Sequence, residues 1–567
     1  MPSEPANAAL PKVEDPEQGR RVAERPASPT EGRPPRLHGL GVCFQSAWLR
    51  RGASALGGFL LFAIFPNPGW HFLVWVACLP LILACLEEPK VGGGFLNGYL
   101  AGAVFFTGSC YWFVYVVGHY GGLGLAFSVG VLALFVVVFS VFFGVFGAIL
   151  TWTARRSKVL ALVAAPFLWV SMEVARTYLI TGFPWNLLGY AVAPEGLRQI
   201  AAITSVYGLS FLAVSAAALV AWAILDQRLP ARSRTRWAAV ALWAVALVTL
   251  NFVLFPPPRG EGAVEDAERS RSAEAVLIQA NVPLDEAALV QWAPWKDRAP
   301  LDRLIGLSEK SAASAPSTSA PALIVWPENP APFYFSRDPI FKSAVEEMVR
   351  KAHAHAVIPT TLYAGAGNVK PKNSAVVLDP QGRDLLDYAK IHLVPFGEYV
   401  PWWAFPDKIG KITFEVGTFV PGDVREAART PDGAITVFIC YEAIFPQLVR
   451  RLTPPGPGVL VNVSDDGWYG DSSAAAQHLL MARFRAIENG RYLLRATNNG
   501  ITAVVDPYGR IVEELPARQQ SALRARFDYE SRRTFYNAYG DVFAWLCLAT
   551  TIGLLTLAGS VRRRTQR

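Results

Sequence analysis

The sequence predicts a multi-pass α-helical membrane region joined to a layered α/β domain. The chain has 567 residues, of which 52% are hydrophobic and 17% charged, and its mean hydropathy is +0.27. This composition is too apolar for an ordinary soluble protein. The apolar excess is concentrated in residues 53–255 and 542–561, whereas residues 256–541 combine charges, turns and short apolar runs.

Composition divides the chain into six segments. Residues 1–38 are rich in Pro, Glu, Arg and Ala and lack apolar periodicity, which predicts a disordered tail. The other segments are a membrane domain of about seven transmembrane helices over 39–255, a Pro- and charge-rich linker over 256–273, an α/β domain over 274–541, a C-terminal transmembrane helix over 542–561 and a basic cytoplasmic tail over 562–567.

Several apolar runs reach the roughly 17–25 residues that a membrane-spanning helix needs. The predicted spans are Phe95–Val117, Leu123–Thr153, Val159–Leu179, Leu197–Leu225, Trp237–Phe255 and Val542–Ser560. Two shorter runs, Ala53–Phe65 and His71–Leu86, are separated by Pro66-Asn-Pro-Gly69. Two short helices or one re-entrant hairpin would fit them, and both alternatives return the chain to the side on which it started.

Lysine and arginine are distributed unequally between the two sets of loops. The basic loops, which all fall on one side, contain Arg50-Arg51, Arg155-Arg156-Ser-Lys158, Arg228 through Arg236 and Arg562-Arg563-Arg564. The positive-inside rule therefore predicts that both termini are cytoplasmic and that residues 256–541 are extracytoplasmic. Because membrane orientation explains much of the net charge of +8, we expect no nucleic-acid partner.

Strand-length and helix-length patterns alternate within residues 256–541. The strand-like runs are Ala275–Gln279, Leu323–Trp326, Ala375–Leu378, Ile435–Ile439, Val459–Asn462 and Thr502–Val505. Helical patterns occupy Pro339–His355, Ala443–Leu452 and Ala474–Glu488. This alternation is typical of a layered α/β domain.

Three chemically complementary side chains accompany these apolar runs. Glu328 closes the run that begins at Ala322, and Cys440 closes the run that begins at Ala434. Lys390 follows a further strand-like segment. A lone cysteine is most often a small buried hydrophobe. A potential base and a cation in the same pattern favour a nucleophile instead, since a base can activate a thiol and a cation can stabilise a thiolate or an oxyanion.

Three further residues have candidate roles beside these. Glu398 lies eight residues after Lys390, beyond a Pro-Phe-Gly turn, and could orient Lys390, assist proton transfer or form a structural ion pair. Tyr441 and Glu442 follow Cys440 directly, where the backbone N–H groups of a starting helix could complete an oxyanion hole.

An ordered set of motifs resembles the apolipoprotein N-acyltransferase family, the bacterial membrane enzymes that complete lipoprotein maturation. The motifs are Trp326-Pro-Glu328, Lys390-Ile-His-Leu-Val-Pro-Phe-Gly-Glu398, Ile439-Cys-Tyr-Glu442, Asn462-Val-Ser-Asp-Asp-Gly-Trp-Tyr-Gly-Asp471, Gln477-His478, Arg485-Ala-Ile-Glu488 and Arg495-Ala-Thr-Asn498. In the membrane half, Gly182-Phe-Pro-Trp-Asn186, after Trp169, Glu173 and Arg176, is also similar to the family.

The resemblance implies a nitrilase-like αββα sandwich in the bacterial inner membrane, with its catalytic domain in the periplasm. It implies a Glu328–Lys390–Cys440 triad that takes an acyl chain from a phospholipid as a thioester. The chain then passes to the α-amine of a diacylglyceryl-modified apolipoprotein. We expect a monomer that needs no cofactor. Two alternatives are a membrane-anchored nitrilase-type amidase and a transporter with a sensor domain.

Other residues have open interpretations. Trp402, Trp403, Phe405, Ile409, Ile412 and Phe414 form an aromatic-rich segment that could be core or a membrane-dipping lid. By the resemblance, Trp292 could belong to a substrate site. We expect no metal site at His353 and His355, which a solvated helix face would explain. Glu173 and Arg176 lie inside a span, where they should pair or face a cavity.

Overall fold

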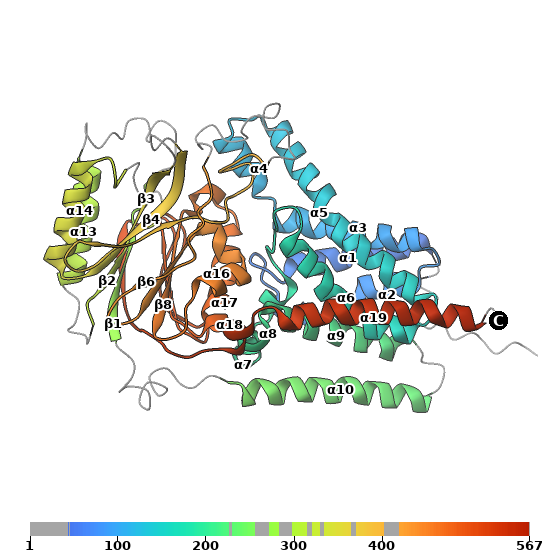
Figure 1. Ribbon diagram of the computed structural model, residues 1–567. Helices are drawn as coiled ribbons and strands as arrows, with labels where there is room; N and C mark the ends of the chain where they lie inside the picture. The colour runs from blue at the N-terminus through green and yellow to red at the C-terminus, as the bar shows by residue number, and fades with distance from the viewer. Residues whose placement is uncertain are drawn as a thin grey trace, which may run out of the picture. The chain divides into compact units, whose positions relative to one another are not determined.

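A computed structural model describes residues 44, 46–225, 230–255, 272–282, 298–313, 320–328, 334–364, 370–401 and 419–565. Two long helical stretches of the chain, residues 47–253 and 542–565, form one part of this structure, and two β-sheets with their flanking helices form the other (Figure 1).

The membrane part is built from long apolar helices. They are α1 (Ala47–Ala63), α2 (Leu79–Leu86), α3 (Val91–Ser109), α5 (Leu125–Ala154), α6 (Lys158–Tyr178), α9 (Val206–Leu225), α10 (Pro230–Val253) and α19 (Val542–Thr565). Among the described residues, five helices are long and apolar enough to cross a membrane, or six if α3 and the bent segment after it form one span. The protein is therefore membrane-embedded.

Two predicted spans differ from the observed helices. After α3, the chain bends by 60° into α4 (Phe113–Tyr115) and a π-helical turn, η3 (Val116–Tyr120), so Phe95–Val117 is not one straight helix. The predicted span Leu197–Leu225 is wrong in its first part, where α7 (Glu195–Arg198) and α8 (Ala201–Thr204) are short separate helices. Ser205 interrupts the helix with a backbone φ of +55°, a local break that hydropathy does not detect.

The shorter apolar runs also form helices. The first run lies in α1, and the second divides into a 3₁₀ turn, η2 (His71–Trp75), and α2. The remaining spans agree with the predicted ranges to within two residues at each end, except that α10 begins earlier, at Pro230, and α19 continues to Thr565.

Within the described residues, two six-stranded sheets form the α/β part. The first has the order β12-β1-β2-β3-β4-β5 and the second has the order β11-β10-β9-β8-β7-β6. The strands of the first sheet are β1 (Ser272–Gln279), β2 (Leu323–Val325), β3 (His355–Ala364), β4 (Lys370–Leu378), β5 (Asp384–Ala389) and β12 (Ser521–Asp528). Those of the second are β6 (Ala428–Arg429), β7 (Ala434–Ile439), β8 (Gly458–Ser464), β9 (Leu493–Thr497), β10 (Thr502–Val505) and β11 (Ile511–Leu515).

Side-chain alternation explains how the sheets are layered. Val276 and Ile278 of β1 pack in one cluster with side chains of α13 (Ala299–Ala313) and α14 (Pro339–Ala352). Ala275 and Leu277, which point to the opposite face, join the cluster that contains the second sheet. Helices α16 (Pro446–Leu452) and α17 (Ala474–Asn489) cover that sheet on its far side (Figure 1). The result is the predicted αββα sandwich.

All six predicted strands are present, and six others are not in the prediction: β3, β5, β6, β9, β11 and β12. The predicted helix Pro339–His355 is wrong at its end. Helix α14 ends at Ala352, His353 adopts a left-handed conformation, and His355 begins β3. His355 is 2% exposed, so it does not lie on a solvated helix face.

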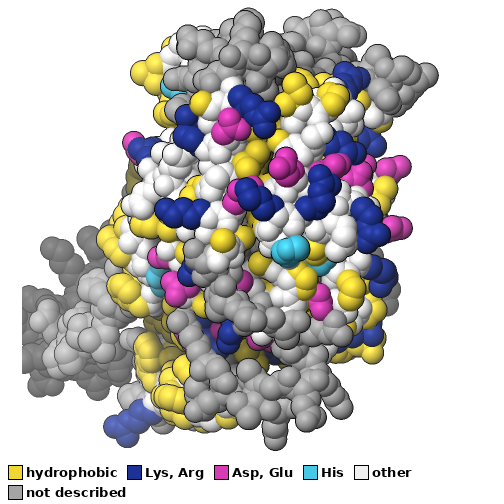
Figure 2. Space-filling model, turned by 90° about the vertical axis from the view of Figure 1, so that its left-hand side faces the viewer, with side chains coloured by type: hydrophobic (Ala, Val, Ile, Leu, Met, Phe, Trp, Pro, Cys, Tyr) yellow, Lys and Arg dark blue, Asp and Glu magenta, His cyan; other side chains and the backbone are white. Residues whose placement is uncertain are grey.

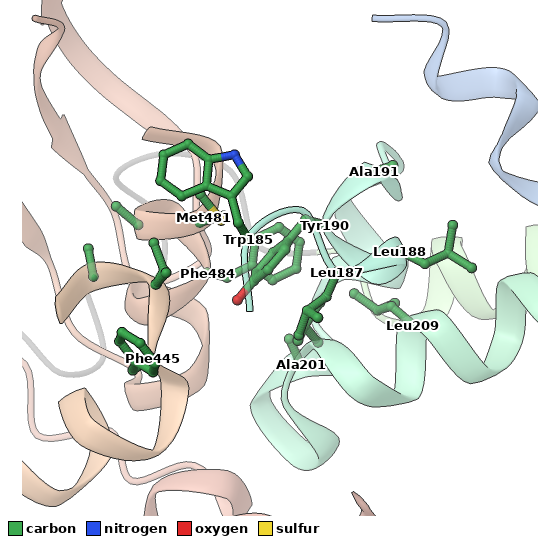
Figure 3. Packing of buried hydrophobic residues seen from close by; sticks show 14 of the residues in the cluster. Trp185, Leu187, Leu188, Tyr190, Ala191, Ala201, Leu209, Phe445, Met481 and Phe484 are labelled. Carbon is green, nitrogen blue, oxygen red and sulfur yellow. The ribbon is translucent and has the colours of Figure 1, made fainter. Parts of the chain in front are cut away.

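Helix α17 joins the sandwich to the membrane part. Tyr190, in the loop after α6, packs edge-on against Phe484 of α17, with 5.0 Å between ring centroids. Trp185 Nε1 donates a hydrogen bond to Gln477 Oε1 over 2.7 Å. Figure 3 shows these loop residues facing Met481 and Phe484 across a continuous apolar contact. The opposite face of the sandwich mixes basic and acidic side chains (Figure 2).

Glu173 and Arg176 of α6 line a small internal cavity of the membrane part together with Asn186 and several aromatic side chains. Glu173 Oε1 accepts hydrogen bonds from Trp169 Nε1 at 3.0 Å and from the Leu188 amide at 2.8 Å. The pair therefore faces a cavity, one of the two arrangements that we expected for charges inside a span.

Candidate active site

The three candidate residues lie together at the ends of three strands. Glu328 follows β2, Lys390 follows β5 and Cys440 follows β7. Strands β2 and β5 belong to the first sheet and β7 to the second, so the site forms where the ends of the two packed sheets meet. Glu328 is 3% exposed, Lys390 1% and Cys440 6%, so the groups are almost completely removed from water.

Lys390 lies between two carboxylates. Its Nζ is 2.8 Å from Glu398 Oε1 and 3.5 Å from Glu328 Oε1. Asn373 of β4 completes the arrangement, since its Nδ2 donates to both of these oxygens at 2.8 Å. The amides of Asp465 and Val394 donate to the second oxygens of Glu328 and Glu398, respectively. The site thus holds the Lys390 cation between two carboxylates. Glu398 forms the closer of the two ion pairs with Lys390.

Burial and the ion pair set the charge states. Burial raises the pKa of Glu328 above its ordinary value, although Lys390 and hydrogen bonds from Asn373 and Cys440 oppose the shift. Burial lowers the pKa of Lys390, but Glu398 and Glu328 outweigh burial and raise it overall. Burial also raises the pKa of the Cys440 thiol, and the Glu328 carboxylate adds to that shift. These shifts favour the protonated form of the Cys440 thiol and the charged form of Lys390.

Cys440 has a strained backbone conformation. Its φ is +49°, in the left-handed region that non-glycine residues rarely adopt. The residue begins a 3₁₀ turn, η6 (Cys440–Ile444), directly after β7. Strain of this kind persists only where neighbouring contacts hold it, so contacts with neighbouring residues must hold the Cys440 backbone in this conformation.

Glu442 ties the Cys440 turn to the Lys390 segment. Its Oε1 accepts hydrogen bonds from the Ile391 amide at 2.7 Å and the His392 amide at 3.1 Å. Its Oε2 accepts from the Ile439 amide at 2.7 Å and the Tyr388 hydroxyl at 2.8 Å. Glu442 therefore fixes the position of Lys390 relative to Cys440.

A second buried network lies behind Cys440. His478 Nε2 is 3.1 Å from the Cys440 carbonyl oxygen, and His478 Nδ1 is 3.0 Å from Asp466 Oδ1. Arg495 Nη2 is 2.7 Å from Asp466 Oδ2. Burial raises the pKa of Asp466, but the Arg495 guanidinium and the His478 imidazole together outweigh burial and hold the pKa well below the ordinary value.

Asn373 and the network of His478, Asp466 and Arg495 are functional-site residues for which the sequence predicted no role. The last three occur in the motifs Gln477-His478, Asn462–Asp471 and Arg495–Asn498, but spacing gave no sign that they contact one another. Asn373 had no sequence signal beyond its position just before the predicted strand Ala375–Leu378.

An apolar pocket of about 300 Å³ opens onto the candidate residues. Its lining includes Phe113, Phe135, Phe139 and Phe183 of the membrane part, Cys440, and Trp468 of the 3₁₀ turn η7 (Asp466–Tyr469). Tyr441 also lines the pocket, and its hydroxyl donates a hydrogen bond to the Gly182 carbonyl oxygen at 3.2 Å. The pocket is therefore shared by the sandwich and the membrane helices and has the character of a site for a hydrocarbon chain.

Some predicted site residues cannot be placed. Trp292, Trp402, Trp403, Phe405, Ile409, Ile412 and Phe414 lie outside the described residues. The lid and substrate-site interpretations therefore stay predictions. Among the described residues, no group of three or more His, Cys, Asp or Glu side chains is arranged to hold a metal ion.

The fold defines a membrane-embedded protein with an αββα sandwich, and comparisons with known proteins identify the class as a nitrilase-like acyltransferase. Residues 286–536 match the family described as Carbon-nitrogen hydrolase. Residues 57–219 match the Apolipoprotein N-acyltransferase N-terminal domain.

The chain is 36% identical to apolipoprotein N-acyltransferase of Geobacter metallireducens over 89% of this chain and 94% of that protein. It is 31% identical to the enzyme of the same name from Methylococcus capsulatus over 90% of this chain and 96% of that protein. The chain belongs to the apolipoprotein N-acyltransferase family.

One solved structure that resembles this chain is Nit3 of Saccharomyces cerevisiae, a member of the nitrilase superfamily. The match has 21% identity, covers 46% of this chain and 90% of Nit3, and gives a TM-score of 0.34.

Proposed function

We propose that this enzyme N-acylates apolipoproteins through a thioester on Cys440, with a phospholipid as the acyl donor. The observation that carries the proposal is the arrangement of Glu328, Lys390 and Cys440 at the mouth of an apolar pocket shared with the membrane helices. An acyl chain can occupy the pocket while its ester carbonyl lies at the thiol. We further propose that the enzyme acts as a monomer.

In the first step, Glu328 takes the thiol proton while Cys440 Sγ attacks the ester carbonyl carbon of the donor. Lys390 stabilises the negative charge that develops on the carbonyl oxygen. When the tetrahedral intermediate collapses, the ester C–O bond breaks and Glu328 returns the proton to the departing glycerol oxygen. The products are a lysophospholipid and an acyl-cysteine thioester.

In the second step, the neutral α-amine of the diacylglyceryl-cysteine attacks the thioester carbonyl carbon. The C–S bond breaks, an amide forms, and the amine proton passes by way of Glu328 to the sulfur, which restores the thiol. Glu398 holds Lys390 in place during both steps, and Glu442 keeps the Lys390 segment aligned with the Cys440 turn.

The amidase alternative is not favoured, because the family is defined by N-acylation and a single helix would suffice to anchor an amidase. Burial of the site also opposes hydrolysis, since Cys440 and Lys390 are shielded from water. Because the chain belongs to an acyltransferase family, transport is excluded as its primary function.

The membrane orientation remains a proposal, with both termini in the cytoplasm and the sandwich in the periplasm. The ion pairs Arg50–Glu88 and Lys158–Glu87 lie at one end of the helices. At the other end, the Tyr120 hydroxyl donates a hydrogen bond to the Gly467 carbonyl oxygen of the sandwich. This separation supports the positive-inside assignment.

We expect a reporter that is active only in the periplasm to function when it is fused near Gly262. The same reporter fused after Arg564 should be silent. Both fusions must be made in full-length protein and compared at equal expression by immunoblot. Activity of the Arg564 fusion, or silence of the Gly262 fusion, would reverse the orientation and place the site on the wrong side for these substrates.

The pH dependence of acyl-enzyme formation should reflect the raised pKa of Glu328. The base works as a carboxylate, so the single-turnover rate should rise with pH through that pKa and fall below it. The midpoint should lie above the value of about 4.3 for an unperturbed glutamate. Asn373→Ala should move the midpoint to higher pH, because Asn373 donates a hydrogen bond that stabilises the carboxylate. A midpoint at or below the unperturbed value, or a downward shift in the variant, would contradict the assigned base.

A further inference from the structure

A second cavity, separate from the apolar pocket, lies beside the same 3₁₀ turn. It has a volume of about 430 Å³ and a more polar lining than the apolar pocket, and we name it the polar cleft. Its walls come from the membrane part at Asn67, Tyr115, His119 and Tyr120, and from three loops of the sandwich. The function described so far does not use the polar cleft.

The turn η7 separates the two cavities. Trp468 and Tyr469 line the apolar pocket, whereas Gly467 and Gly470 line the polar cleft. Tyr120 packs against this turn from the membrane side, since its hydroxyl donates to the Gly467 carbonyl oxygen at 3.0 Å and its ring centroid lies 4.5 Å from that of Trp468. A substrate with an apolar part and a polar part could occupy both cavities by crossing this boundary.

The lining of the polar cleft suits a polypeptide backbone. Its small residues, which allow a main chain to approach closely, are Gly467, Gly470, Ala475, Ala476, Gly500 and Ala517. The hydroxyl and amide side chains of Asn67, Ser472 and Asn499 can both donate and accept hydrogen bonds, as peptide groups require. Asn499 Oδ1 is buried and has no hydrogen-bond partner among the described residues.

The same lining does not suit the phosphate of a lipid headgroup. Arg518 is the one Lys or Arg among the described residues of the polar cleft, and it forms an ion pair with Asp471. Phosphate sites typically offer cationic donors that are not already neutralised. Between a polypeptide and a lipid phosphate, the lining of the polar cleft therefore favours the polypeptide.

We infer that the polar cleft binds the acceptor's polypeptide, meaning the residues that follow the lipid-modified cysteine. This inference rests on the proposed function and identifies where the second substrate continues beyond the reacting amine. The acceptor's lipid chains lie on the membrane side, its amine meets the thioester at Cys440, and its polypeptide crosses η7 into the polar cleft. Recognition through small residues and main-chain groups would tolerate many sequences.

The test compares two acceptors on the full-length enzyme in phospholipid-containing micelles. One acceptor is a diacylglyceryl-cysteine amide without further residues, and the other carries a peptide of roughly ten residues, long enough at about 3.3 Å per residue to extend through the cleft. The variant Ala517→Trp fills the polar cleft from an exposed loop position. Ala313→Trp, at the exposed end of α13, is the matched control.

We expect Ala517→Trp to raise the KM for the long acceptor by about tenfold, equivalent to about 1.4 kcal/mol, and to leave the short acceptor unchanged. Asn499→Ala should raise the KM for the long acceptor about three- to tenfold, since it removes one hydrogen-bonding group. Ala313→Trp should change neither value.

Equal effects of Ala517→Trp on both acceptors, or no effect on either, would overturn the inference. Slower acyl-enzyme formation from phospholipid in this variant would assign the polar cleft to the donor headgroup instead. Failure of the proposed function is distinguishable from both results, because the unmodified enzyme would then form no acyl adduct on Cys440 with any donor.

Discussion

Enzyme given phospholipid without an acceptor should accumulate one acyl chain on Cys440, and three substitutions should prevent this. Cys440→Ala removes the nucleophile and should abolish the adduct. Glu328→Gln removes the base while it nearly preserves side-chain volume. Lys390→Ala removes the cation that stabilises the oxyanion. Loss of one such stabilising group costs about 3–4 kcal/mol, or roughly a factor of 10² to 10³ in rate. Intact-mass measurement, with cleavage by neutral hydroxylamine, detects the thioester.

Two further variants separate the roles around the triad. Glu398→Gln should slow the adduct without abolishing it, because Lys390 keeps its contact with Glu328 at 3.5 Å. Tyr441→Phe removes the hydroxyl that bonds to Gly182, and serves as a control for general disturbance of the pocket. An adduct that forms at the normal rate in Cys440→Ala would show that another residue is the nucleophile, and the mechanism would be wrong.

Asp466→Ala should cause the largest loss of stability. The substitution leaves Arg495 fully buried without its carboxylate, and breaking a buried ion pair by removing one partner costs about 3–5 kcal/mol. It also removes the contact that holds His478 against the Cys440 carbonyl oxygen. We therefore expect a lower thermal unfolding midpoint in detergent and a slower acylation of the protein that remains folded.

Asp423→Ala is the matched comparison, because this carboxylate is 90% exposed and lies 4.0 Å from Lys372. A surface pair of this kind contributes about 0–1 kcal/mol, so the midpoint should barely move. Equal midpoints for the two variants would mean that the Asp466 network does not stabilise the fold.

In the sequence, Glu328 and Cys440 follow predicted apolar strands and Lys390 follows a strand-like segment, and the structure brings the three together at the ends of β2, β5 and β7. The sequence could not predict Asn373 or the Asp466 network, since these groups meet only through tertiary packing of segments remote in the chain. The strands β11 and β12 were missed because exposed polar residues interrupt their apolar pattern, as Glu513, Glu514, Arg524 and Arg526 illustrate. Hydropathy located the membrane helices but could not detect the break at Ser205.

The contact surface of α17 means that the two halves of the chain cannot be treated as separable modules. Met481 and Phe484 are 0% and 1% exposed, and their cover includes the membrane-side loop around Tyr190 (Figure 3). Two of the hydrogen bonds of Gln477, with Trp185 and with the Pro66 carbonyl oxygen, come from the membrane half. Excision of the sandwich would expose this apolar surface to water and leave a buried amide without two of its partners. The folding of the sandwich that carries the reacting groups is therefore coupled to the folding of the lipid-facing scaffold.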